Sequence, residues 1–177
     1  MRLDLTKIRT PHEHFAQVYP PEAFAAASGT DAEFTVASPV KLEFDIHKDK
    51  SSFRLVGRTE TTLEVPCSRC LEPMVLPVDA SFDLRYQPHT ANTGEGEREI
   101  EEDDLTTAFY ENDEIDLGQL MREQFYLALP MKPLCREDCK GLCAQCGTNL
   151  NTGTCDCAPV WEDPRLAALK ALKGKNA

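Results

Sequence analysis

The sequence predicts an α+β protein in which an antiparallel β-meander is packed by one main helix and followed by a zinc-bound C-terminal module with a terminal helix. Three observations predict this class. Three stretches between residues 40 and 86 alternate apolar and polar residues, one stretch between 116 and 129 has helical spacing, and the cysteines occur in short pairs. Alternation is the period of a half-buried strand, whereas apolar residues at i, i+3 and i+4 indicate an amphipathic helix.

Short elements precede the meander. Leu3, Leu5 and Ile8 predict a strand near the N-terminus, and residues 20–27 predict a short helix. Pro21 opens this helix, because its fixed φ and its missing N–H suit the first helical turn.

The meander itself consists of three predicted strands, at residues 40–46, 53–65 and 74–86. A polar turn separates the first two strands, and residues 66–73 separate the second from the third. The strands are long enough to share one buried face. Cys67 and Cys70 therefore lie at a turn between two strands of one sheet.

The periodicity stops at residues 87–114, which are expected to form an acidic, flexible loop. Residues 95–116 contain 11 acidic groups and one arginine, so most of the chain's formal net charge of −11 is concentrated there. Such a run is typical of a solvated connection that repels itself. It also suits a surface that attracts a basic partner. The predicted partner-binding residues are Glu99, Glu101, Glu102, Asp103 and Asp104.

The main helix is expected to begin at Asp116, which forms a capping box with Gln119, and to end at Pro130. We expect this helix to pack on the sheet. A terminal helix is predicted from Asp163-Pro164 to Gly174. The predicted domains are residues 1–134, the β-rich α+β domain, and residues 135–177, the cysteine-rich zinc module with the terminal helix.

Composition and motifs exclude several classes of protein. At 177 residues, with 41% hydrophobic and 28% charged residues, the chain suits a soluble domain with at most a small appendage. No apolar run approaches the roughly 20 residues that cross a bilayer, and no signal peptide fits, so we expect a cytoplasmic protein without membrane contacts. The acidic composition lacks the basic footprint of a stand-alone nucleic-acid binder. No glycine-rich nucleotide motif or nucleophile elbow occurs.

The cysteines are the strongest chemical signal. A reducing cytosol disfavours disulfides, and the paired spacing favours metal. Cys143 and Cys146, followed by Cys155 and Cys157, form a compact set of four thiols within 15 residues. Structural zinc takes four such ligands in a tetrahedron. This set is therefore predicted to bind one zinc ion.

The other two pairs are Cys67/Cys70 and Cys135/Cys139, which lie far apart in the sequence. If one zinc ion joins them, it fastens the turn of the sheet to the segment that leaves the helix. This arrangement gives about two structural zinc ions. An alternative puts Cys139 with Cys143 and Cys146 and leaves the remaining cysteines free or redox-active.

The alternative interpretation of the Cys67/Cys70 pair is that the protein is a dithiol oxidoreductase that uses these two cysteines. Such a motif usually lies at a helix N-terminus after a strand, where the helix dipole lowers the thiol pKa. Here the flanking segments are strands, with Pro66 before the pair and Pro73 after it. A purely structural zinc adaptor is a further alternative.

Several motifs occur together in a distinctive order. They are Val65-Pro-Cys-Ser-Arg-Cys-Leu-Glu-Pro73, Glu114-Ile-Asp-Leu117, Leu127-Ala-Leu-Pro-Met-Lys-Pro-Leu-Cys135, Cys139-Lys-Gly-Leu-Cys143 with Cys146-Gly147, Asn149-Leu-Asn151 and Asp163-Pro-Arg-Leu-Ala167. Over roughly residues 40–172 the chain resembles the YceD-like family, the large ribosomal RNA subunit accumulation proteins of bacteria and plastids. The resemblance implies a non-enzymatic factor that promotes accumulation of large-subunit ribosomal RNA. It also implies that Cys67, Cys70, Cys135 and Cys139 form one unit and the other four cysteines a separable one.

The net negative charge constrains how such a factor acts. Unspecific phosphate contacts require an excess of basic residues, whereas this chain has 19 basic and 30 acidic residues. We expect the partner to be a basic large-subunit ribosomal protein or a pre-ribosomal particle. Direct contact with RNA, through basic residues of the zinc module and C-terminal region, is the second choice.

Overall fold

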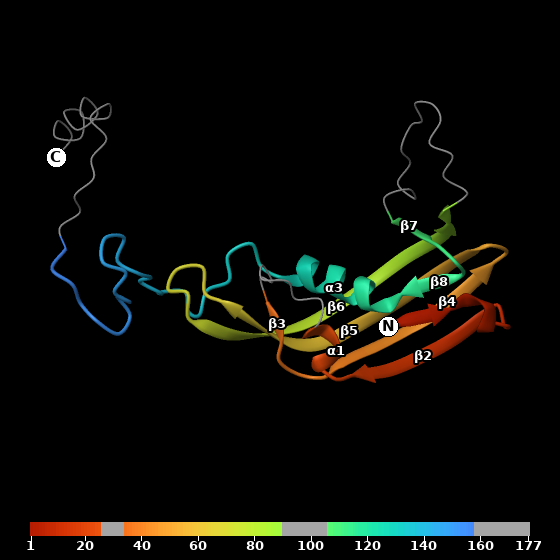
Figure 1. Cartoon of the computed structure of the whole chain (residues 1–177), viewed down its shortest axis with the longest axis horizontal. Coiled ribbons are helices and arrows are strands. Elements are labelled where there is room, and N and C mark those ends of the chain that lie inside the picture. The colour runs from red at the N-terminus through yellow and green to blue at the C-terminus, as the bar shows by residue number, and fades with distance from the viewer. Residues whose placement is uncertain (26–33, 90–105, 158–177) are drawn as a thin grey trace, which may run out of the picture.

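The computed structural model describes residues 1–25, 34–89 and 106–157. Its main element is a six-stranded sheet, whose main order is β2-β4-β5-β6-β7, with β3 paired to β5 (Figure 1). The strands are β2 (His12–Tyr19), β3 (Thr35–Val36), β4 (Val40–Asp49), β5 (Ser52–Pro66), β6 (Pro73–Pro88) and β7 (Thr107–Tyr110). A separate two-stranded sheet pairs β1 (Arg2–Asp4) with β8 (Glu114–Asp116).

The predicted meander is confirmed as β4, β5 and β6, which pair antiparallel in sequence order. Their inward residues alternate with exposed ones, as half-buried strands require. Gly57 of β5 lies opposite both Phe44 and Phe82. A Cβ atom on Gly57 would lie 2.2 Å from the carbonyl oxygen of Glu43. Only glycine therefore permits this close approach of β4 and β5.

The sheet is mixed, so the prediction of an entirely antiparallel sheet is wrong at one edge. Strand β7 pairs parallel to β6, with Tyr86 opposite Ala108. The predicted loop at 87–114 is also too long, since β6 continues to Pro88 and 107–110 form β7. Residues 90–105, including the predicted partner-binding residues Glu99, Glu101, Glu102, Asp103 and Asp104, lie outside the described residues.

The main helix, α3 (Leu117–Ala128), is confirmed. The Asp116 Oδ1 atom accepts hydrogen bonds from the backbone N–H groups of Gly118, at 2.8 Å, and Gln119, at 3.1 Å. The reciprocal half of the predicted capping box does not form, because the Gln119 side chain donates to Glu123 instead. The predicted terminal helix at 163–174 lies outside the described residues.

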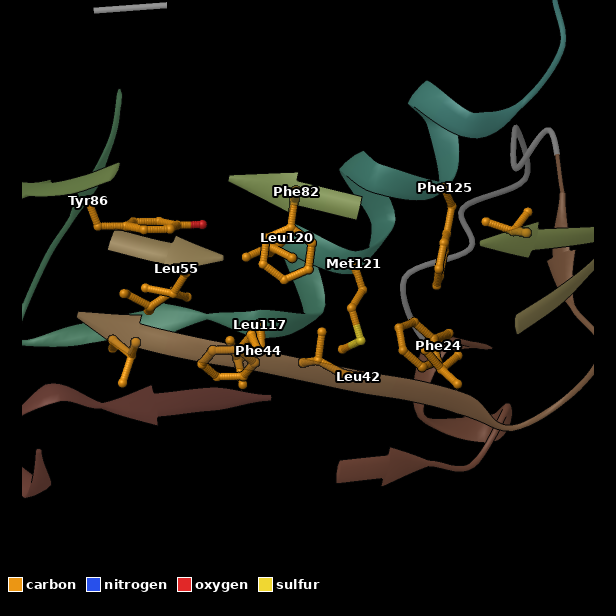
Figure 2. Close-up of a cluster of buried hydrophobic side chains, with 14 of the residues drawn as sticks. Phe24, Leu42, Phe44, Leu55, Phe82, Tyr86, Leu117, Leu120, Met121 and Phe125 are labelled. Carbon is orange, nitrogen blue, oxygen red and sulfur yellow. The ribbon is translucent and has the colours of Figure 1, made fainter. Parts of the chain in front are cut away.

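The core lies between α3 and one face of the sheet. Leu117, Leu120, Met121 and Phe125 of the helix pack against apolar side chains of β4, β5 and β6 (Figure 2). The opposite face of these three strands carries mostly polar and charged residues. No helix in the described part of the chain is long and apolar enough to cross a membrane.

The N-terminal region is only partly as predicted. The expected strand is limited to β1, after which Leu5–Lys7 forms a 3-10 helix that buries Leu5. The predicted short helix is present as α1 (Glu22–Ala25), which begins after Pro21. Strand β2 was not predicted, and its Phe15 ring stacks on Phe44 with 5.2 Å between centroids.

Candidate metal centres

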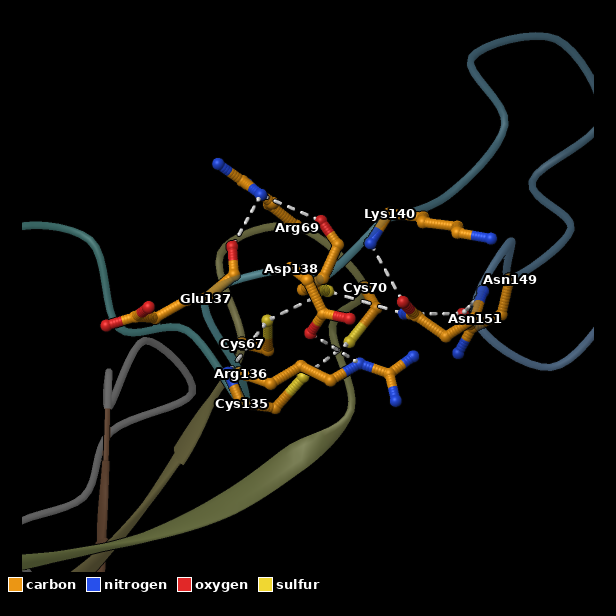
Figure 3. Close-up of polar contacts among 11 residues, drawn as sticks. Cys67, Arg69, Cys70, Cys135, Arg136, Glu137, Asp138, Lys140, Asn149 and Asn151 are labelled. Atoms are coloured by element: carbon orange, nitrogen blue, oxygen red, sulfur yellow. Dashed lines mark hydrogen bonds and ion pairs between the residues drawn. The ribbon is translucent and has the colours of Figure 1, made fainter.

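The hairpin of β5 and β6 ends in a tight turn that holds two cysteines. Strand pairing continues to Pro66 and Pro73, and the backbone N–H of Cys67 donates to the carbonyl oxygen of Glu72 at 2.9 Å. The N–H of Leu71 then donates to the Cys67 carbonyl, and Leu71 has a left-handed φ of 60°. This turn places the Cys67 and Cys70 thiols on one side of the loop, as Figure 3 shows.

The chain leaving α3 brings two more cysteines to this turn. The Ser68 N–H donates to the Pro133 carbonyl at 2.8 Å, and the Arg69 guanidinium donates to the Cys139 carbonyl at 2.8 Å. The Cys67 and Cys139 sulfurs lie 3.8 Å apart, and those of Cys70 and Cys135 lie 3.7 Å apart. All four sulfurs lie within 4.8 Å of one another. We call Cys67, Cys70, Cys135 and Cys139 the first cysteine group.

The remaining cysteines form a second, more exposed group. The sulfurs of Cys143, Cys146, Cys155 and Cys157 also lie within 4.8 Å of one another. The Cys143 N–H donates to the Thr148 carbonyl at 2.8 Å, and the Gly147 N–H donates to the Cys143 carbonyl at 2.9 Å. Gly147 has a φ of 73°, which glycine adopts without strain.

Backbone amides favour a thiolate in the first group. Hydrogen bonds from the N–H groups of Cys70, Cys135 and Arg69 lower the pKa of Cys67 to about 6. Desolvation, together with the neighbouring Cys139 and Cys70 sulfurs, raises the pKa of Cys135 to about 12. Negative charges so close together repel, so four thiolates coexist only when a cation lies among them.

The second group likewise contains one thiol with a lowered pKa and one with a raised pKa. The hydroxyl and backbone N–H of Thr148 lower the pKa of Cys146 to about 6. The neighbouring Cys146 thiolate, together with burial, raises the pKa of Cys157 to about 12. Each group is thus a cluster of four soft sulfur ligands that could hold a metal ion such as zinc.

Two asparagines join the groups. Asn151, in the loop between Cys146 and Cys155, donates from Nδ2 to the Cys139 sulfur at 3.3 Å and accepts from the Lys140 N–H at 2.8 Å (Figure 3). Asn149 donates to the Glu72 carboxylate at 2.7 Å and accepts from the Asn151 N–H at 2.9 Å. The loop of the second group therefore supports a ligand of the first.

The structure brings all eight predicted ligands together, in the four-plus-four grouping. The alternative that places Cys139 with Cys143 and Cys146 does not match this geometry. Occupation by zinc stays a prediction, as does the domain boundary at residue 135. The supporting roles of Asn149 and Asn151 were missed. Their sequence suggests only a turn, and the Cys139 contact depends on how the two groups fold together.

An apolar hollow of about 470 Å³ borders the first group. It lies between the cysteine turn and the end of α3, where Leu71, Tyr126 and Met131 are exposed. The side chains of Leu71 and Met131 are 64% and 101% exposed.

Comparison with known proteins identifies relatives. The family model for large ribosomal RNA subunit accumulation protein YceD matches residues 55–173. Two chloroplast proteins that carry this name are similar. The chain is 28% identical to the Zea mays homologue, over 77% of this chain and 53% of the relative, and 26% identical to the Arabidopsis thaliana homologue, over 80% and 50%. It thus spans about half the length of both.

A bacterial relative matches over more of its own length. The uncharacterized protein YlbN of Bacillus subtilis is 31% identical over 76% of this chain and 74% of the relative. No solved structure matches the chain. The family model covers most of β5 and all of β6, the main helix and both cysteine groups. The chain therefore belongs to the YceD family of large ribosomal RNA subunit accumulation proteins.

Proposed function

We propose that this protein is a non-enzymatic ribosome-assembly factor that promotes accumulation of large-subunit ribosomal RNA. Its membership of the YceD family carries the proposal. The test is a strain that lacks the gene. The ratio of large- to small-subunit ribosomal RNA should fall, and expression of this chain should restore it. An unchanged ratio would contradict the role in RNA accumulation.

The two cysteine groups each hold one structural zinc ion in this proposal. Cys67, Cys70, Cys135 and Cys139 hold the first ion, and Cys143, Cys146, Cys155 and Cys157 hold the second. Four sulfur ligands match the closed ligand sets of structural zinc, and the amide and hydroxyl donors around Cys67 and Cys146 favour the thiolates that zinc requires.

Elemental analysis of protein purified under reducing conditions tests the zinc assignment. The expected content is about two zinc ions per chain, one for each group. Absence of zinc, together with a mass that corresponds to four disulfides, would contradict it. A content near one ion would show that only one group retains its metal.

The partner is a basic large-subunit ribosomal protein or a pre-ribosomal particle that contains one. The formal net charge of −11 supports a basic partner over bare RNA. Pulldown with the tagged chain should recover pre-ribosomal particles. A zinc adaptor that acts outside ribosome assembly would recover none, so the same pulldown separates these two functions.

A dithiol oxidoreductase is the second candidate, because the lowered pKa of Cys67 is typical of a reactive thiol. Burial opposes this activity, since Cys67 has no exposed surface and Cys70 is only 4% exposed. Thiol titration distinguishes the two functions. Structural zinc protects the thiols until a chelator is added, whereas a redox dithiol reacts without chelator.

A further inference from the structure

A polar pocket of about 320 Å³ lies at the end of the sheet opposite the cysteine turn. It is bounded by the end of β6, by β7 and β8, and by the first turns of α3. Figure 1 shows these elements gathered around β7, far from the C-terminal cysteine-rich segment. The family assignment and the zinc proposal do not use this pocket.

Four carboxylates line the pocket, from Glu111, Glu114, Asp116 and Glu123. Arg2 binds Glu114 at 2.9 Å, Gln119 donates to Glu123 at 2.9 Å, and Asp116 caps α3. Within the described chain, the Glu111 side chain has no ion pair. The α-amino group of Met1 also lies 3.8 Å from Asp116. The four carboxylates of the lining therefore exceed the two positive charges, of Arg2 and of this amino group, that pair with them.

The hydroxyl of Tyr86, a largely buried residue that lines this pocket, has no hydrogen-bond partner among the described residues. Tyr86 is only 7% exposed, and its hydroxyl points toward Leu120 of α3, which lines the same pocket (Figure 2). By contrast, the neighbouring Tyr110 donates to the Ser51 carbonyl at 2.9 Å. The hydroxyl of a tyrosine this far buried usually has a hydrogen-bond partner, so an unpaired one at a pocket wall is available to a ligand.

The charged groups near Tyr86 restrict the chemistry of a ligand that could bind there. Burial and the carboxylates of Glu123 and Asp116 raise the pKa of Tyr86 to about 12. The phenol is therefore neutral at physiological pH and lies close to both carboxylates. A ligand that satisfies all three groups must donate several hydrogen bonds and carry positive charge.

The spacing of the carboxylates favours an extended cation over a metal ion. A metal ion needs ligand atoms that converge on one point, but the cysteine groups are the only described sets of three or more metal-ligating atoms that come within 4.8 Å of one another. A guanidinium offers five N–H donors in a plane and so reaches separated acceptors. Phe109, 43% exposed at the rim, supplies an aromatic face on which a guanidinium can stack.

We propose that this pocket binds an arginine side chain of a basic protein segment, with Glu111 and Glu123 pairing the guanidinium and the Tyr86 hydroxyl accepting one N–H. The inference deepens the proposed function, since it rests on a basic protein partner. It assigns the recognition of that partner to described residues, independently of the acidic run at 99–104.

The test uses the full chain with ¹³C-labelled tyrosine rings and two short peptides. One peptide is acetyl-Gly-Arg-Gly-amide, and its counterpart has citrulline, which keeps the shape of arginine without the charge. The Tyr86 ring signals, assigned with Tyr86→Phe, should shift saturably with the arginine peptide and remain unchanged with the citrulline peptide. Amide signals of residues 119–123 give the affinity in every variant.

A matched pair of variants tests the carboxylates. Glu111→Gln with Glu123→Gln should raise the Kd roughly tenfold, because a charge-assisted hydrogen bond is lost. Glu64→Gln with Glu137→Gln removes the same charge far from the pocket and should change the Kd less than about twofold. Tyr86→Phe should weaken binding by a few-fold, as expected for one neutral hydrogen bond.

Several results would overturn the inference. They are an unmoved Tyr86 signal, an equal shift with citrulline, or equal losses in the pocket and control variants. Displacement of the peptide by Mg²⁺ with the same Tyr86 shift would make this an inorganic cation site and would also refute it. The ribosomal RNA ratio in the deletion strain is measured separately, so failure of the pocket and failure of the proposed function remain distinguishable.

Discussion

Two glycines beside the cysteines have the same backbone conformation but different surroundings. Gly141 has a φ of 75° and Gly147 a φ of 73°. A Cβ atom on Gly141 would lie 2.9 Å from the Arg69 carbonyl oxygen, whereas one on Gly147 would meet nothing within 4 Å. Gly141 lies where the chain passes the cysteine turn, and Leu142 donates its N–H to the same Arg69 carbonyl.

Alanine substitution separates conformational strain from steric contact. Gly147→Ala should lower the free energy of unfolding by about 1 kcal/mol, the cost of a left-handed conformation for a residue with a Cβ. Gly141→Ala should cost more, since the clash with Arg69 adds to the same strain. Urea denaturation of both variants measures the difference. Equal losses of unfolding free energy would show that the close contact of Gly141 with the cysteine turn adds nothing to the cost of the substitution.

Asn151 provides a residue-scale test of the link between the cysteine groups. Asn151→Asp removes the N–H donor to the Cys139 sulfur and places a negative charge beside it, while an oxygen remains for Lys140. Zinc affinity of the first group should fall about tenfold, as is typical when a group supporting a metal ligand is changed. Competition with a colorimetric chelator measures this affinity.

The control for charge is Asn112→Asp, an equivalent change at an exposed turn with a φ of 54°. It should leave zinc affinity unchanged. If both variants behave alike, the hydrogen bond from Asn151 does not support the metal ligand.

At the scale of elements, long periodic segments were predictable and short or polar ones were not. Strands β4, β5 and β6 and helix α3 follow clear apolar repeats, because each buries one face on the same core. Strand β2 places Phe15 and Tyr19 toward that core but has Glu13 and Gln17 on the same side, so its alternation is weak. Strand β7 has four residues, too few to define a period.

The candidate site was predictable to a similar extent. The spacing of the cysteines indicates the ligands, since a sulfur tetrahedron requires paired turns. Their partition depends on contacts such as Ser68 with Pro133, which join segments far apart in the chain. The Tyr86 pocket leaves no motif in the sequence, because three strands and a helix meet there only after folding.

Strand β5 contains two buried threonines that differ in hydrogen bonding. Within the described chain, the Thr59 hydroxyl is the only fully buried side-chain N or O atom without a partner. The Thr61 hydroxyl donates to the Ser38 carbonyl at 3.1 Å. The two residues lie on the same face of one strand and are 0% and 7% exposed.

Valine has the shape of threonine but no hydroxyl. Substitution by valine should therefore change the stability of the fold in opposite directions at these two positions. Thr59→Val should stabilise the fold by about 1 kcal/mol, because an unsatisfied buried hydroxyl is removed. Thr61→Val should destabilise it by about 1 kcal/mol, since the Ser38 carbonyl loses its donor. Thermal unfolding of the two variants checks the sign. Stabilisation at both positions would show that the hydrogen bond from Thr61 to Ser38 makes no net contribution to the stability of the fold.

At the scale of the whole molecule, the hydrophobic core and the first cysteine group are separate clusters. The main core extends from Leu5 to Phe125, whereas Cys67, Cys70 and Cys139 form a cluster of their own with Leu134 and Leu142 beside it. The sheet and α3 thus bury their apolar surface without help from the cysteines. Zinc is expected to organise the cysteine-rich segment more than the sheet.

Removal of metal by a chelator under reducing conditions tests this division. Hydrogen exchange should accelerate in residues 134–157 and at the cysteine turn, and remain slow in β4 and in the central part of β5. The far-UV circular dichroism of the sheet should persist. Loss of protection throughout the sheet would mean that the core depends on the metal.

The length of the β5–β6 hairpin has a consequence for how a large particle is held. Its two strands, β5 and β6, contain 15 and 16 residues. At about 3.3 Å per residue, the Tyr86 pocket and the cysteine turn are therefore roughly 40 Å apart. Two contacts at a fixed separation bind one object with an avidity that exceeds either affinity by roughly 10²–10⁴-fold, provided their spacing matches. A partner that reaches both the pocket and the apolar hollow at the turn would dissociate far more slowly than an isolated basic segment. The hairpin would thereby discriminate by size, favouring an assembled particle over the same ribosomal protein free in solution.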